Sequence, residues 1–225
     1  MSETWLNEWS EQKILLAEKL NSGECGGTYA EAVIILCSVL SGIAADTWPG
    51  KHKDRKRFVE LLTRYSDESL EADKVSIPLL IGALREQELM SEADALFREF
   101  MPNGKCKIIT GGDVDKKESD VVSVCPNLPK KLIRENSYAH ILYKEIRSGY
   151  THEYMPGSRS DSWAMGSERK NSFISYVNRA DKPNRLIYFN VSWLVELVRS
   201  IVRSAPVITD ISEAKKFKNW WLLSQ

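Results

Sequence analysis

The residues best suited to chemistry lie in one segment, residues 140–154, which contains His140, Tyr143, Arg147 and His152. A histidine changes its protonation near neutral pH and can transfer a proton, whereas an arginine stays charged and binds anions. Common catalytic motifs are missing elsewhere, since the sequence has no phosphate-binding loop, no dinucleotide-binding fingerprint, no G-x-S-x-G elbow and no H-E-x-x-H helix. If the chain is catalytic, we expect the chemistry in this segment.

The spacing of these residues has a geometric consequence. The apolar positions predict a helix, and at about 100° per residue His140, Tyr143 and Arg147 share one face of it. His152 lies about 140° around the helix from Arg147 and about 7.5 Å further along. The two side chains therefore flank one groove only if a second surface, for example the same helix of another subunit, packs between them.

The sequence of this segment resembles a known family. Residues 142–153 read LYKEIRSGYTHE, which is similar to the R-x(4–6)-H signature of HEPN domains. These helical domains occur as ribonucleases, toxins and modules that bind RNA or nucleotides. The likeness includes Gly149, the Pro156-Gly157 pair that ends the predicted helix, and the earlier Trp48-Pro49-Gly50. It spans about residues 29–202.

The resemblance implies a metal-independent endoribonuclease, related to toxins or phage defence, that acts as a homodimer. Arg147 and His152 would be its catalytic residues, and Ser148, Glu153 and Tyr143 would support them. RNA supplies the 2′-hydroxyl as nucleophile, so His152 would move protons and Arg147 would stabilise the phosphorane. Catalytic members often carry Asn, Asp or His after the arginine, and Ser148 is not a comparable base.

Two other interpretations remain open. The chain could be a non-catalytic HEPN-like module that binds RNA, a nucleotide or a protein partner, and a toxin would also have an antitoxin as partner. It could instead be a purely structural helical protein. Arg147 would then be a surface arginine or form a buried salt bridge, and His152 would be a helix-terminal histidine that the helix dipole favours.

The charge balance limits how the chain could bind nucleic acid. Lys and Arg together number 31, as do Asp and Glu, so the formal net charge is zero and a broad basic coat is excluded. A local basic patch is still possible, although such clusters are usually solvated helix starts. The candidate RNA-binding residues are Lys51, Lys53, Arg55, Arg57 and Arg159, with Arg169 and Lys170 as further candidates.

Cysteine usage and hydropathy point to the cytoplasm. None of the four cysteines forms a C-x-x-C pair and only three histidines are present, so we expect free thiols and neither a metal nor another cofactor. The N-terminus lacks the basic and apolar regions of a secretory signal. The most apolar run, residues 32–45, is shorter than the ~20 residues of a membrane span, so we expect a buried core helix and no membrane association.

The fold expected from these patterns is all-α: a HEPN-like helical bundle with a small β-hairpin, in one domain over residues 1–225. Residues 173–177 and 186–189 are rich in β-formers and predict the hairpin. Residues 102–128 are rich in glycine and charge, which predicts a loop insertion on the surface. Two short β-like runs within it, 107–110 and 121–124, could pair with each other. Helical periodicity then continues from 129 to 154.

Overall fold

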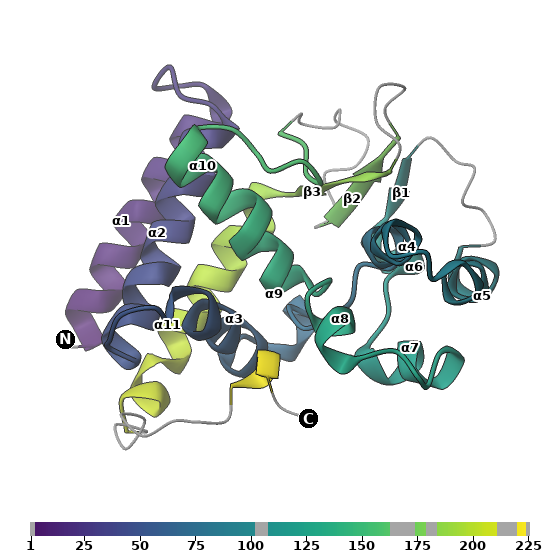
Figure 1. Cartoon of the computed structure of the whole chain (residues 1–225). Coiled ribbons are helices and arrows are strands. Elements are labelled where there is room, and N and C mark those ends of the chain that lie inside the picture. The colour runs from purple at the N-terminus through teal and green to yellow at the C-terminus, as the bar shows by residue number, and fades with distance from the viewer. Residues whose placement is uncertain (1–2, 102–107, 163–173, 179–183, 211–219, 224–225) are drawn as a thin grey trace.

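The computed structural model describes residues 3–101, 108–162, 174–178, 184–210 and 220–223. It is mostly helical and contains a small three-stranded antiparallel sheet, which confirms the expected class of fold. Figure 1 shows a helical layer formed by α1, α2 and α11 on one side of the molecule and the pair α4 and α5 on the other. Helix α8 lies between these two parts, and the chain then runs through α9 to α10, which lies beside α2.

The central helix of the first part is α2 (Tyr29–Thr47), which packs against α1 (Glu3–Ser22), α3 (Asp54–Tyr65) and α11 (Val191–Asp210). Thr28 caps its N-terminus, and the Glu31 carboxylate accepts the Thr28 N–H at 2.7 Å. Among the described helices, only α2 is long and apolar enough to cross a membrane, but a core helix meets the same criteria. Nine residues of α2 are buried in the core, as expected for such a helix.

The C-terminal turn η5 (Trp221–Leu223) is tied to this bundle. The Trp221 N–H donates to Oε2 of Glu60 on α3 at 2.6 Å. Its carbonyl oxygen accepts from Nη1 of Arg134 at 2.7 Å, and the Arg134 guanidinium lies 5.1 Å from the centre of the Trp221 ring. Two charged side chains, on α3 and α8, therefore fix the backbone of this turn.

The expected hairpin is present. Strands β2 (Ile174–Val177) and β3 (Leu186–Phe189) pair antiparallel, with Ile174 opposite Phe189 and Val177 opposite Leu186. The third strand, β1 (Ile108–Thr110), pairs antiparallel with β2. The predicted pairing of 107–110 with 121–124 is therefore wrong, because residues 121–124 are helical and β1 pairs with β2 instead.

The prediction of a loop insertion at 102–128 is also wrong for its described part. Residues 108–128 form β1, α6 (Gly111–Val114) and α7 (Glu118–Val124), and the structure buries the side chains of Val114 and Val121. Asp115 is fully buried and accepts hydrogen bonds from the Ile77 backbone N–H and the Tyr138 and Tyr176 hydroxyls, at 2.9, 2.5 and 2.5 Å. This segment therefore joins the sheet to α4 (Ile77–Glu86), which packs against α5 (Met90–Phe100).

The helix predicted over residues 129–154 is broken once by a turn and contains one π-helical segment. A turn separates α8 (Lys130–Arg134) from α9 (Tyr138–Ile141), and α9 continues through a π-helical segment, η2 (Leu142–Arg147), into α10 (Ser148–Glu153). Tyr154 ends α10 in the left-handed conformation. The chain then folds back, and the Gly157 N–H donates to the Glu145 carbonyl oxygen at 2.7 Å. π-helical turns are rare and often lie at functional sites.

Candidate functional site

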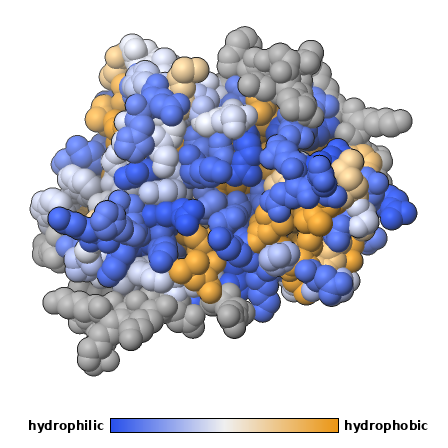
Figure 2. Space-filling model, viewed as in Figure 1, coloured by the Kyte–Doolittle hydropathy of each residue, from blue (hydrophilic) through white to orange (hydrophobic). Residues whose placement is uncertain are grey.

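A cleft of about 650 Å³ runs along one side of the α9–η2–α10 helix, with the ends of α4 and α8 on its other side. Figure 2, in the same view as Figure 1, shows that hydrophilic residues cover most of the middle of this face. The volume lies in the range of small-molecule sites. The helix contributes His140, Lys144, Ser148, His152 and Glu153 to its wall.

Most of these residues recur every four positions and so share one helix face. Of the predicted catalytic and supporting residues, the cleft therefore brings together Ser148, His152 and Glu153. His152 and Glu153 are exposed at the end of α10, and no hydrogen bond joins their side chains. The imidazole of His152 is thus accessible from the cleft.

Arg147 does not line this cleft. Its guanidinium carbon lies 5.3 Å from the centre of the Tyr143 ring, a cation–π contact, and Tyr143 in turn packs on Phe58. The Arg147 charge also reaches Cys37 on α2: burial raises the pKa of this thiol to about 12, and Arg147 acts in the opposite direction. Arg147 therefore lies outside the cleft that contains His152, and one chain does not bring the two residues together at this cleft.

Arg147 is half-buried, yet it forms no ion pair within the part of the chain that the structure describes. Buried charges are normally paired because their desolvation is costly. The buried salt bridge that a purely structural Arg147 would form is therefore not found among the described residues. The Tyr143 ring holds the guanidinium without neutralising it, which leaves its donors free for an anion.

His140 lies at the other end of the cleft and is 3% exposed. Its Nδ1 is 2.7 Å from the Glu135 carbonyl oxygen, so the Nδ1–H donates there and Nε2 is the acceptor. Burial lowers the pKa of His140 to about 4, and the imidazole is therefore neutral at neutral pH. Twelve residues separate His140 from His152, about 18 Å along the helix axis, so the two cannot act on the same phosphate.

The basic residues predicted to bind RNA fall into different places. Arg55 lies in the cleft wall and is exposed, whereas Lys51 and Lys53 are not among the lining residues. Arg57 forms an ion pair with Asp54, and its Nη1 donates to the Trp48 and Gly50 carbonyl oxygens at 3.4 Å. Arg57 therefore holds the turn before α3 in place.

Arg159 lines the cleft but is bound to the wall. Its Nε donates to Oε1 of Glu145 at 2.8 Å, and its Nη1 donates to Oδ1 of Asn136 at 3.0 Å. This network ties the loop after α10 to η2 and to the turn between α8 and α9, so Arg159 has a structural role. Arg169 and Lys170 lie outside the described residues.

Sequence reasoning did not single out Lys144, which is exposed in the cleft one turn after His140. The signal was available, because His140, Lys144, Ser148 and His152 recur at intervals of four and such residues share a helix face.

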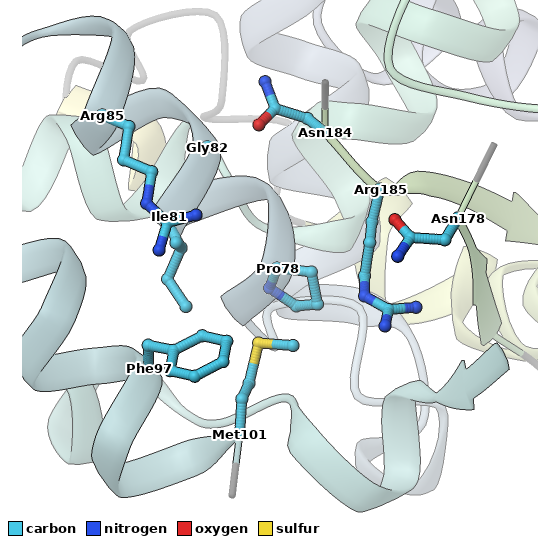
Figure 3. Close-up of a pocket in the computed structure, with 9 residues that line it drawn as sticks. All are labelled: Pro78, Ile81, Gly82, Arg85, Phe97, Met101, Asn178, Asn184 and Arg185. Carbon is cyan, nitrogen blue, oxygen red and sulfur yellow. The ribbon is translucent and has the colours of Figure 1, made fainter. Parts of the chain in front are cut away.

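A smaller cavity of about 200 Å³ lies between α4, α5 and the ends of β2 and β3. Figure 3 shows its apolar floor, formed by Pro78, Ile81, Phe97 and Met101, below the side chains of the strand ends. It contains none of the residues singled out from the sequence. The described residues include no group of three or more His, Cys, Asp or Glu that could hold a metal, and the thiols of Cys25, Cys37 and Cys125 are free.

Comparison of the chain with family models, curated proteins and solved structures finds no match. The likeness to HEPN domains thus depends on the motif residues themselves.

Proposed function

We propose that this protein is a HEPN-like, metal-independent endoribonuclease that acts as a homodimer, with Arg147 and His152 as its catalytic residues. The observation that carries the proposal is the half-buried Arg147 guanidinium, which rests on Tyr143 and has no carboxylate partner among the described residues. A charge kept in this state is a preformed binding site for an anion such as a phosphodiester.

The need for two copies follows from the different positions of the two side chains. His152 lines the cleft, whereas Arg147 lies outside it, with its guanidinium over the Tyr143 ring. A second copy that packs its own α10 against this helix would place its His152 beside Arg147 of the first. A twofold axis would then create two equivalent sets of these residues.

The reaction needs no metal. A neutral His152 accepts the proton of the 2′-hydroxyl, whose oxygen attacks the neighbouring phosphorus. Arg147 stabilises the charge that builds on the phosphorane oxygens. The bond from phosphorus to the 5′-oxygen then breaks, and the His152 that accepted the proton donates it to that oxygen. The products are a 2′,3′-cyclic phosphate and a 5′-hydroxyl end. Ser148 lines the cleft and can hydrogen-bond the strand without acting as a base.

The test is incubation of the purified protein with total RNA in EDTA. We expect cleavage by the wild type, and a loss of at least about 100-fold in Arg147→Ala and in His152→Ala, the size usual for one electrostatic or proton-transfer group. Matched controls are Arg98→Ala, an exposed arginine on α5, and His52→Asn, which suits the left-handed conformation of residue 52. Equal cleavage by all five proteins would refute the assignment of the site.

A binding module without catalysis is the second candidate. It is favoured by the separation of Arg147 from His152 within one chain and by Ser148, which cannot replace a base. RNA that binds without being cut, in a manner that depends on Arg147, would support it. Expression offers a further distinction, because an active RNase toxin without its antitoxin slows the growth of the producing cell and a binding module does not.

A further inference from the structure

The smaller cavity, between α4, α5 and the ends of β2 and β3, has room for one apolar group. Its volume is about 200 Å³, and four side chains form its floor: Pro78, Ile81, Phe97 and Met101. The structure buries Ile81 and Met101 and leaves the Phe97 ring half-buried. An apolar cavity of about 150 Å³ is large enough to hold benzene. This cavity therefore admits a single ring or a branched chain of similar size.

Polar side chains surround this floor. Figure 3 shows Arg85 on the α4 side of the cavity and Asn178 and Arg185 on the side of the strand ends. None of the described residues that line the cavity is a carboxylate. A guanidinium presents its N–H donors in a plane that matches a carboxylate. The described wall thus suits a ligand with an apolar body and an anionic group.

Arg85 has donors available for such a group. Its guanidinium carbon lies 6.0 Å from the centre of the Phe97 ring, so its charge stands beside the apolar floor. Within the described parts of the chain its one ion pair is with Asp94, at 3.9 Å between Nη2 and Oδ1, which is too long for a hydrogen bond. Both side chains of this pair are exposed, and such a pair contributes little to stability. A ligand anion can therefore use the Arg85 donors at little cost.

The other polar groups of the rim are engaged within the protein. Arg185 is 8% exposed and interacts with other parts of the chain. Asn184 donates from Nδ2 to Oε1 of Glu86 at 3.1 Å, which holds the chain before β3 close to α4. Gly82 permits this approach, because a Cβ atom there would lie 3.2 Å from the Asn184 side chain. These contacts shape the rim and leave Arg85 as the cation that a ligand would meet.

We propose that this cavity binds a small carboxylic acid with one ring or a branched apolar chain, whose carboxylate accepts hydrogen bonds from Arg85 and whose body rests on Phe97 and Met101. Aromatic rings and thioethers both make favourable contacts with a ring. An inorganic anion would meet the arginine but leave the apolar floor uncovered. The volume of about 200 Å³ lies below the roughly 300–1,000 Å³ of sites for larger ligands. The proposal does not depend on ribonuclease activity.

The test is a ligand-detected NMR titration of the full chain with benzoate and cyclohexanecarboxylate as probes. Acetate carries the charge without the body, and benzamide carries the ring without the charge. We expect at least one probe to bind with a dissociation constant of about 1 mM or lower, and acetate and benzamide to bind at least about tenfold more weakly. N-acetylphenylalanine, which ends as a polypeptide does, is the last ligand. If it binds and neither probe does, the cavity takes the C-terminus of a partner protein and the proposal is wrong.

The variants identify the site. Arg85→Gln removes the charge from an exposed side chain and should weaken binding of the better probe at least about tenfold. The matched control is Arg98→Gln, at an exposed arginine of α5 that is not among the lining residues, and it should bind as the wild type does. Because neither side chain is buried, we expect both variants to fold, which their unfolding midpoints check. Absence of saturable binding by both probes up to about 10 mM, or binding that Arg85→Gln leaves unchanged, would overturn the proposal.

Discussion

Substitution of Asp115 by Asn should make the protein more stable above neutral pH. Asp115 is fully buried, and this burial raises the pKa of its carboxyl from 3.8 to about 7, against the hydrogen bonds from Tyr138, Tyr176 and Ile77 that act in the other direction. Asn resembles the protonated carboxyl, since its Oδ1 can accept the Ile77 N–H while its amide donates to the tyrosine hydroxyls. The variant therefore keeps the hydrogen-bond network without the buried charge.

The magnitude follows from linkage. Below pH 3.8 the carboxyl is protonated in both the folded and the unfolded chain. Between pH 3.8 and 7 only the unfolded chain loses the proton, so the free energy of unfolding falls as pH rises. About three pKa units at ~1.36 kcal/mol each give a loss of about 4 kcal/mol, complete above pH 7. We expect Asp115→Asn to match the wild type near pH 4 and to exceed it by up to about 4 kcal/mol at pH 8.

The assay is urea denaturation of both proteins at intervals from pH 4 to 8, with the difference in free energy of unfolding plotted against pH. The difference isolates Asp115 from groups such as His140, whose lowered pKa of about 4 makes stability fall as pH drops from 6.5 toward 4. A variant less stable than the wild type at pH 8 would refute the reasoning. It would mean that the three hydrogen bonds outweigh the desolvation of the carboxylate.

Two further substitutions test the walls of the cleft and the C-terminal turn. Gly157→Ala would place a Cβ atom 2.1 Å from Oε2 of Glu145, so we expect the free energy of unfolding, measured with denaturant, to fall by about 1–3 kcal/mol. The control is Gly42→Ala, whose Cβ would meet nothing within 4 Å and which should be neutral or stabilising. Arg134→Ala removes the donor to the Trp221 carbonyl and a partly buried ion pair, so the free energy of unfolding should fall by about 2 kcal/mol. Trp221 fluorescence should also shift toward that of an exposed indole. Unchanged unfolding midpoints in Gly157→Ala or Arg134→Ala would show that these contacts contribute little.

The parts of the fold that the sequence predicted have strong local patterns. The hairpin was placed correctly because β2 and β3 are both runs of β-forming residues. Helices α6 and α7 have four and seven residues, at most two turns, so no period could appear. Asp115 also looks like a surface residue until its three partners, distant in sequence, are known.

The candidate site was predictable only in part, for a related reason. The helix positions of Arg147 and His152 follow from their spacing, and His152 does lie in a cleft. The turn at residues 135–137, which provides the carbonyl for His140, depends on contacts with other elements and has no helical pattern to reveal it.

The π-helical segment η2 gives this helix an unusual tolerance of length change. A π turn is equivalent to an α-helix that has gained one residue, so loss of one residue within 142–146 would restore ordinary α-helical hydrogen bonding. The helix would survive, and because the wider turn absorbs the extra residue, the segment after the deletion would face nearly the same direction relative to His140. Arg147 and His152 would therefore stay on nearly the same sides of the helix and keep their mutual spacing. The π segment thus lets the chain differ by one residue before the motif without a change in the surface that presents it.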